Sequence, residues 1–140
     1  MLRVFNRFVV AMVSVLFLLV SFSASAEKKW ISLAVLDDGT KWEAKPGSFE
    51  FKENRSGIPI AVLTGRVVNK KPSTIDLRKW YVTAGDCKNK MGKLVSLDVS
   101  GEYQHENDFL FDSGSVASSI AQFICEVAEE SIKQADGKSL

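Results

Sequence analysis

The stretch Ser115–Lys133, SVASSIAQFICEVAEESIK, carries the clearest structural pattern of the 140-residue chain. With Ser115 as the N-cap, steps of about 100° per residue gather the apolar side chains on one broad arc. Glu129 precedes Lys133 by one helical turn, a spacing at which the two charges attract each other. The pattern predicts one amphipathic helix that needs a broad apolar surface to pack on. Its apolar arc contains Val116, Ala117, Ile120, Ala121, Phe123, Ile124, Cys125, Val127, Ala128 and Ile132.

Upstream of this helix, apolar and polar residues alternate at period two in several short segments, which is typical of strands. Short polar connections between them, such as Asp37-Asp38-Gly39, favour antiparallel pairing. The fold class predicted is α+β, an antiparallel sheet of five or six strands packed against one C-terminal amphipathic helix. The second half of 75–82 is bulky on both faces, which predicts a strand covered on both sides. The candidate strands lie in 30–36, 48–53, 60–68, 75–82 and 95–99, with an undecided segment at 102–111.

The first 26 residues have the organisation of a secretory signal peptide. Arg3 and Arg7 precede the apolar run Val9–Val20, and Ala24-Ser25-Ala26 forms a small-residue cleavage site, so cleavage between Ala26 and Glu27 is predicted. The alternative is an uncleaved anchor, but the run is shorter than the ~20 residues of a spanning helix, so no membrane span is expected after cleavage. The mature chain, residues 27–140, is then one small domain, ordered over about 29–134, and periplasmic, secreted or at the cell surface.

Cys87 and Cys125 are the only cysteines of the chain, so one intramolecular pairing exists. In an oxidising compartment they are expected to form a disulfide that joins helix to sheet. Closing that loop stabilises a domain by roughly 4 kcal/mol in the chain-entropy picture. A redox-active pair is the alternative, but the sequence contains no Cys-x-x-Cys motif.

The charges of the mature chain are nearly balanced. Arg3 and Arg7 are the only charges in the leader, so 16 of the 18 basic residues remain against 17 acidic ones. This balance argues against nucleic acid as a partner, although a local basic patch could bind a sulfated polysaccharide. Lys88, Lys90 and Lys93 form such a patch in a predicted loop after Cys87, and they are the candidate partner-binding residues. Ordinary solvated loop charge is the alternative interpretation.

The sequence offers little for catalysis, and no catalytic, metal or cofactor site is predicted. His105, the single histidine, could pair with Glu106 or Asp108 as an acid–base couple, or be an exposed histidine of a polar connection between strands. Neither the ligand spacing of a zinc site nor that of a calcium loop occurs. Trp30, Trp42 and Trp80 could bind a carbohydrate or a protein, or else pack in and around the core.

The order of these features resembles the bacterial surface-adhesin E-like domain family. The resemblance covers about residues 29–127 and rests on the leader, Trp30, the Pro46-Gly47-Ser48-Phe49 segment, the aromatic strand that leads to Cys87, and a C-terminal helix with Cys125. It implies a small antiparallel sheet with helical cover, export by a Gram-negative bacterium, and adhesion to host matrix or serum proteins, sometimes as a homodimer. No lipid-attachment cysteine is present, which departs from surface-anchored members.

The function expected from the sequence is therefore non-enzymatic. The chain is predicted to be an exported binding module of the bacterial envelope, adhesin E-like, whose partner is another macromolecule such as a host matrix or envelope protein. The alternatives are a periplasmic inhibitor or regulator of an enzyme, acting through the loop Lys88–Lys93 or residues 105–108, and a small hydrolase built around His105.

Overall fold

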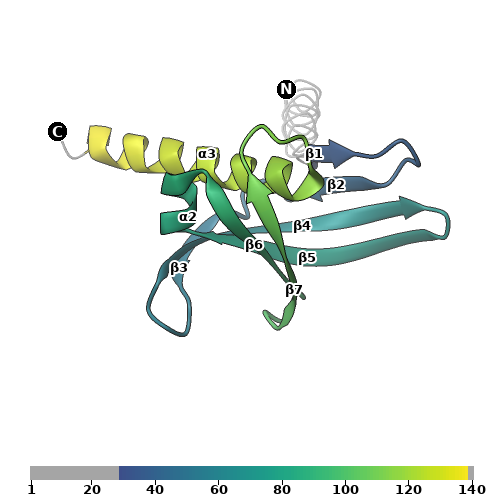
Figure 1. Cartoon of the computed structure of the whole chain (residues 1–140), viewed down its shortest axis with the longest axis horizontal. Coiled ribbons are helices and arrows are strands. Elements are labelled where there is room, and N and C mark those ends of the chain that lie inside the picture. The colour runs from purple at the N-terminus through teal and green to yellow at the C-terminus, as the bar shows by residue number, and fades with distance from the viewer. Residues whose placement is uncertain (1–28, 139–140) are drawn as a thin grey trace, which may run out of the picture.

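A computed structural model describes residues 29–138, which form an antiparallel sheet with two helices on one of its faces (Figure 1). The predicted α+β class, an antiparallel sheet packed against a C-terminal amphipathic helix, is confirmed. The predicted cleavage site at Ala26 and Glu27 lies outside the described residues. In chain order the elements are β1 (Ile31–Val35), β2 (Lys41–Ala44), β3 (Glu50–Glu53), β4 (Pro59–Lys70), β5 (Ser73–Thr83), α2 (Ala84–Asn89), β6 (Met91–Leu97), β7 (Tyr103–Leu110) and α3 (Val116–Lys138).

The sheet is built around the long β4–β5 hairpin. Its strand order is β1-β2-β4-β5-β6-β7, and β3 pairs with β4 on the edge that β2 also uses. Pairing between β4 and β5 runs without a break from Ile60 opposite Thr83 to Lys70 opposite Ser73. The other strands are therefore added to the two outer edges of this hairpin.

The described part of the sheet has seven strands rather than the five or six predicted, because β2 and β3 lie end to end along β4. The Pro46-Gly47 turn separates them, and Ser48 spans the break. Its hydroxyl lies 2.7 Å from the Lys45 carbonyl and accepts the Thr64 N–H at 3.1 Å. A side chain thus replaces one rung of the ladder, and two short strands occupy the place of one.

The core lies between α3 and the sheet face that carries Trp80. Trp80 of β5 is 1% exposed, and Ile120 and Ile124 of α3 are equally inaccessible. Because side chains alternate along a strand, the even-numbered residues Trp80 and Val82 face α3, and the odd-numbered residues of β5 face away from it. We call the side away from α3 the open face. The remaining core members include Ala44, Ala61, Leu63, Val67, Leu94, Phe109, Ala121 and Ala128.

The start of α3 agrees with the prediction. The Ser115 hydroxyl accepts the Ser118 N–H at 3.0 Å, which satisfies one of the free amides of the first turn. The predicted Glu129–Lys133 pair is formed at 3.3 Å. The helix continues to Lys138 rather than ending near residue 134.

Two local predictions are wrong. A turn is predicted after Cys87, but Ala84–Asn89 forms the short helix α2. The segment 102–111, which the pattern leaves undecided, contains strand β7. The strand covered on both sides is also not found, because both helices lie on one face (Figure 1) and Tyr81, which points to the open face, stays partly exposed.

Candidate functional site

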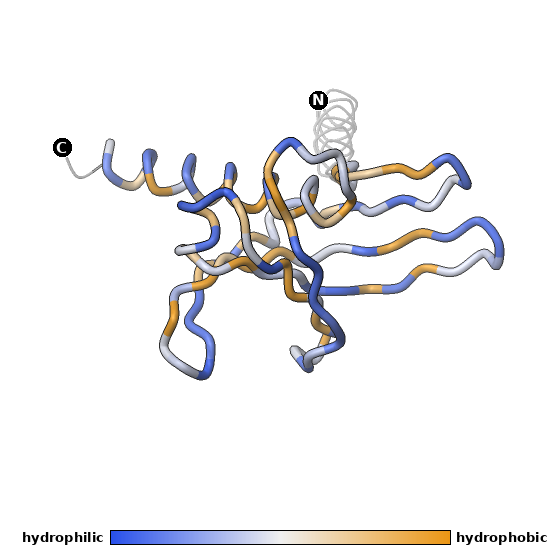
Figure 2. Tube along the Cα trace, viewed as in Figure 1, coloured by the Kyte–Doolittle hydropathy of each residue, from blue (hydrophilic) through white to orange (hydrophobic). Residues whose placement is uncertain are grey.

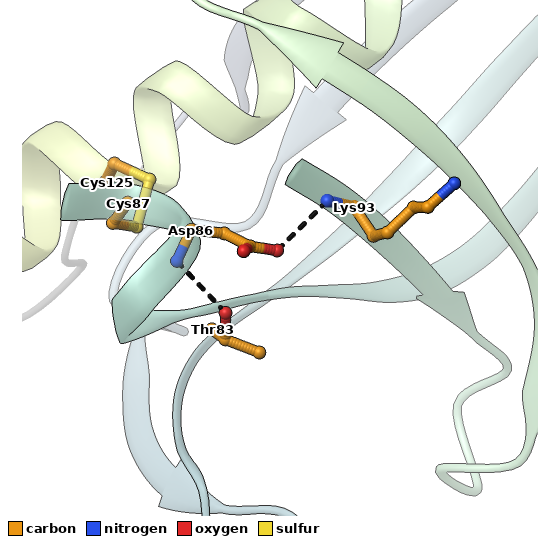
Figure 3. Close-up of a disulfide and its surroundings, with 5 residues drawn as sticks. All are labelled: Thr83, Asp86, Cys87, Lys93 and Cys125. Atoms are coloured by element: carbon orange, nitrogen blue, oxygen red, sulfur yellow. Dashed lines mark hydrogen bonds between the residues drawn. A yellow bond between two sulfur atoms is a disulfide. The ribbon is translucent and has the colours of Figure 1, made fainter. Parts of the chain in front are cut away.

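The predicted disulfide joins Cys87 of α2 to Cys125 of α3, with the two Cα atoms 5.4 Å apart (Figure 3). Asp86, in the first turn of helix α2, ties the helix to the strands on either side of it. The Asp86 N–H donates to the Thr83 hydroxyl at 3.2 Å, and the Asp86 carboxylate accepts the Lys93 N–H of β6 at 3.0 Å. These bonds fix the position of Cys87 relative to the sheet, so the disulfide ties α3 to a rigid point.

The three lysines of the predicted partner-binding loop do not lie in a loop. Lys88 belongs to α2, Lys90 is its C-cap at φ 60°, and Lys93 is in strand β6. Lys93 pairs with Asp108 of β7, and this carboxylate raises the pKa of the lysine through a hydrogen bond and charge attraction. The three lysines therefore do not form one patch. Lys88 and Lys90 lie together near α3, whereas Lys93 is paired with Asp108.

His105 lies in strand β7, opposite Ser96 of β6, and not in a connection between strands. Within residues 29–138 it makes no hydrogen bond or ion pair with Glu106 or Asp108. The described residues also contain no group of three or more histidine, cysteine or acidic side chains that could hold a metal ion.

The tryptophans pack against the fold. Trp80 is buried in the core and Trp42 packs against it. The ring of Trp30 lies 4.1 Å below the guanidinium of Arg66, whose Nε donates to Glu43 at 2.9 Å. The three tryptophans therefore pack in and around the core, which is the second of the two interpretations of these residues.

One edge of β5 is open over part of its length. β6 pairs with β5 at Lys79, Trp80 and Tyr81, and no strand of residues 29–138 lies beside Ser73–Arg78 on that side. We call this stretch the β5 edge. It lies in the part of the β4–β5 hairpin that projects beyond β6 and β7, while β2 runs along the other edge of the hairpin (Figures 1 and 2). Ile75 and Leu77 point to the open face there and are 62% and 50% exposed.

The open face continues from the β5 edge into a cleft between two turns. The β3–β4 turn and the β6–β7 turn flank a space of about 630 Å³ whose walls include Arg55, Tyr81 and Tyr103. Burial, followed by the charges of Glu106 and Tyr103, raises the pKa of Tyr81, so its phenol remains a neutral hydrogen-bonding group at physiological pH. The cleft therefore places the Tyr81 hydroxyl, a hydrogen-bond donor, next to the β5 edge.

A second surface lies on the opposite side of the sheet, beneath the C-terminal half of α3. Here α3, α2 and the start of β4 enclose a groove of about 550 Å³. The disulfide forms part of its wall, and Phe51 and Ile132 stand at its mouth, each about half exposed. We call this surface the α3 groove.

Comparison of the chain with protein-family models, with curated proteins and with solved structures found no match. Among residues 29–138, no helix has both the length and the hydropathy needed to cross a membrane.

Proposed function

We propose that this protein is an exported, non-enzymatic binding module of the bacterial envelope or cell surface. Its partner is a protein that supplies an extended segment, and the segment pairs with the β5 edge as an additional strand. The observation that carries this proposal is the open outer edge of Ser73–Arg78, a stretch that pairs with β4 on its other side and carries the exposed side chains of Ile75 and Leu77.

Strand addition fits this edge because it offers two kinds of contact at once. Unpaired backbone N–H and C=O groups give hydrogen bonds that do not depend on sequence, and alternate side chains select the incoming strand. Ile75 and Leu77 are two residues apart, so both contact the same face of an added strand. Asp76 and Arg78, on the other face, pair with each other at 2.7 Å and leave no uncompensated charge at the edge.

The other outer strands are protected in ways that β5 is not. β1 contains an irregularity between Ser32 and Ala34, and β3 has only four residues. β7 presents five polar residues in succession, from Gln104 to Asp108. Irregular and short edges resist the addition of another strand, and a polar run offers an incoming strand no apolar side chain to pack on. The β5 edge is therefore the site at which pairing with a partner is most favourable.

Export is supported by the disulfide, because such bonds persist in oxidising compartments. The predicted leader and the resemblance to the adhesin E-like family favour the same location. Partners to test are host matrix proteins and proteins of the bacterial envelope.

The test compares the mature chain with the double variant Ile75→Lys/Leu77→Lys. We expect wild type to retain a partner from host matrix or envelope extract, and the variant to lose at least tenfold in affinity. Hydrogen exchange of the complex should show new protection at the amides of Ser73–Arg78. Leu36→Lys/Val99→Lys, which changes two exposed apolar residues in turns, is the matched control and should bind normally.

Two results would overturn the proposal. One is a partner that wild type and Ile75→Lys/Leu77→Lys retain equally, because the edge would then play no part. The other is a homodimer in sedimentation equilibrium that the variant abolishes, because a second copy would then occupy the edge. Circular dichroism and the disulfide content must show that each variant is folded.

A further inference from the structure

We propose that the α3 groove is a binding site for a long-chain fatty acid, with the acyl chain in the groove and the carboxylate at Lys88 and Lys90. The groove lies on the side of the sheet opposite the open face, so this site is separate from the β5 edge and does not depend on the function proposed for that edge.

The size and lining of the groove suit a small apolar ligand. Its volume of about 550 Å³ falls within the range of ordinary small-molecule sites, which are concave and mostly apolar with few polar groups. Helix α3 contributes one stripe, Cys125, Ala128 and Ile132, whose spacing places them on the same face. Ala84 of α2 and Phe51 of β3 face them across the groove.

The apolar surface at the mouth is uncovered in the described chain. Ile132 is 52% exposed and Phe51 is 53% exposed, although each continues the buried lining outward. Helix α3 extends past α2 at this end of the molecule (Figure 1), and it carries Ile132 with it. An acyl chain laid along the groove would remove both side chains from water, which is the main source of binding energy for such a ligand.

Charge at the rim selects the head group. Of the acidic residues there, Glu129 pairs with Lys133 at 3.3 Å, whereas Glu126 accepts a hydrogen bond from the neutral Gln122 amide at 3.2 Å and keeps its charge. Lys88 and Lys90 also line the groove, and neither has an ion pair among residues 29–138. The two ammonium groups therefore outnumber the one carboxylate without an ion pair, which favours an anionic head group over a cationic one.

A peptide fits the groove less well than an acyl chain. The walls formed by α2 and α3 use their backbone groups within the helices, and β4 is paired on both sides at Ile60–Val62. β3, which contributes Phe51, has a free outer edge of only four residues, so these walls offer an extended polypeptide less backbone to pair with than the β5 edge does. What the walls offer is apolar surface and two lysines, which matches a chain of methylene groups ending in a carboxylate.

The test is calorimetric titration of the folded, oxidised mature chain, freed of bound lipid, with saturated carboxylates of eight to sixteen carbons below their micelle concentration. We expect saturable 1:1 binding whose Kd falls about fourfold for each added methylene until the groove is full. Dodecanoate should bind more tightly than 1-dodecanol, and dodecyltrimethylammonium should bind most weakly.

Two pairs of variants locate the site. Lys88→Gln/Lys90→Gln should weaken dodecanoate binding about tenfold and leave 1-dodecanol binding unchanged, and Lys41→Gln/Lys45→Gln, outside the groove, should change neither. Ala84→Trp fills the groove from an exposed position and should abolish binding, whereas Gln134→Trp on the outer side of α3 should not. An absence of saturable binding would overturn the proposal. So would binding that ignores the head group and both lysines, or binding that survives Ala84→Trp.

Discussion

The six-membered ring of Trp80 occupies the space that a Cβ atom at Gly65, on the neighbouring strand, would take, and the carbonyl of Glu43 also borders this space. Gly65 is therefore a packing requirement of the core. No side chain could be added there without moving Trp80, which is almost fully buried.

We accordingly expect Gly65→Ala to lower the free energy of unfolding by about 1–3 kcal/mol, the range for overpacking a core. Urea denaturation of the mature chain measures this. Gly85→Ala is the matched control, because a Cβ atom at Gly85 meets no heavy atom of residues 29–138 within 4 Å. Gly85 lies in α2, so alanine there should leave stability unchanged or raise it by up to about 1 kcal/mol. Equal effects of the two changes would contradict the packing argument.

The disulfide should supply a large part of the stability. Cys87 and Cys125 are 38 positions apart, and replacing both by serine should lower the free energy of unfolding by about 4 kcal/mol. The comparison is made by urea denaturation of wild type with and without a reductant, beside the double variant. A loss below about 1 kcal/mol would mean that sheet and helix packing alone hold α3 in place.

Ser118 should be more important than its position on a helix suggests. Its buried hydroxyl accepts the Leu110 N–H at 3.1 Å and lies 2.7 Å from the Ser115 hydroxyl. Ser118→Ala leaves the Leu110 amide without that acceptor, so we expect a loss of about 1–3 kcal/mol in thermal or urea unfolding. Ser119→Ala, one residue along the same helix, should change stability by less than about 0.5 kcal/mol. If the two variants are equally stable, water satisfies the Leu110 amide instead.

Asp98 should give the protein an acid-dependent contribution to stability. Its carboxylate accepts hydrogen bonds in the β6–β7 turn, first from the Ser100 hydroxyl and then from the Glu102 N–H, and these lower its pKa below the ordinary value of 3.8. Because the folded pKa is depressed, the contribution is complete above the unfolded pKa and is lost as the pH falls through the folded one.

The stability difference between wild type and Asp98→Asn should therefore be largest near neutral pH and shrink in acid, as followed by unfolding at a series of pH values. Asp37→Asn, in another hairpin turn, is the control. An NMR titration of the Asp98 carboxyl that gave an ordinary or raised pKa would refute this account.

Export has a direct chemical test. Expressed in a Gram-negative bacterium, the protein should begin at Glu27 and be lighter than the reduced chain by the two hydrogen atoms that the disulfide replaces. Intact mass under non-reducing conditions measures both. A product that retains Met1 and carries free thiols would exclude the proposed location.

The parts of the fold that sequence could predict are those set by local pattern. The apolar arc of α3, its cap at Ser115 and the hairpin turn at Asp37-Asp38-Gly39 all depend on neighbouring residues, and each is found where expected. Helix α2 was missed, although Thr83-Ala84-Gly85-Asp86 has the spacing of a helix cap and Asp86 does donate its N–H to Thr83. The strand-like residues before Thr83 masked that signal.

The two candidate sites could not be predicted, because each arises from distant segments. The β5 edge exists because β6 pairs with only three residues of β5. The sequence of Ser73–Arg78 gives no sign of where that pairing ends. The α3 groove depends on the position of α2 between the helix and the sheet. Of the residues in these two sites, the sequence indicates only Lys88 and Lys90. It groups them with Lys93, which in the structure lies outside the α3 groove and pairs with Asp108.

The central position of the β4–β5 hairpin implies an order of assembly. Its two strands are adjacent in sequence and joined by a tight turn, so they can meet quickly with little loss of chain entropy. β3 comes earlier in the chain, yet it pairs with β4 alone, and the β1–β2 hairpin joins the sheet only where β2 pairs with β4. The N-terminal strands should thus be synthesised first and join the sheet late, which makes the β4–β5 hairpin the nucleus on which the rest of the domain condenses.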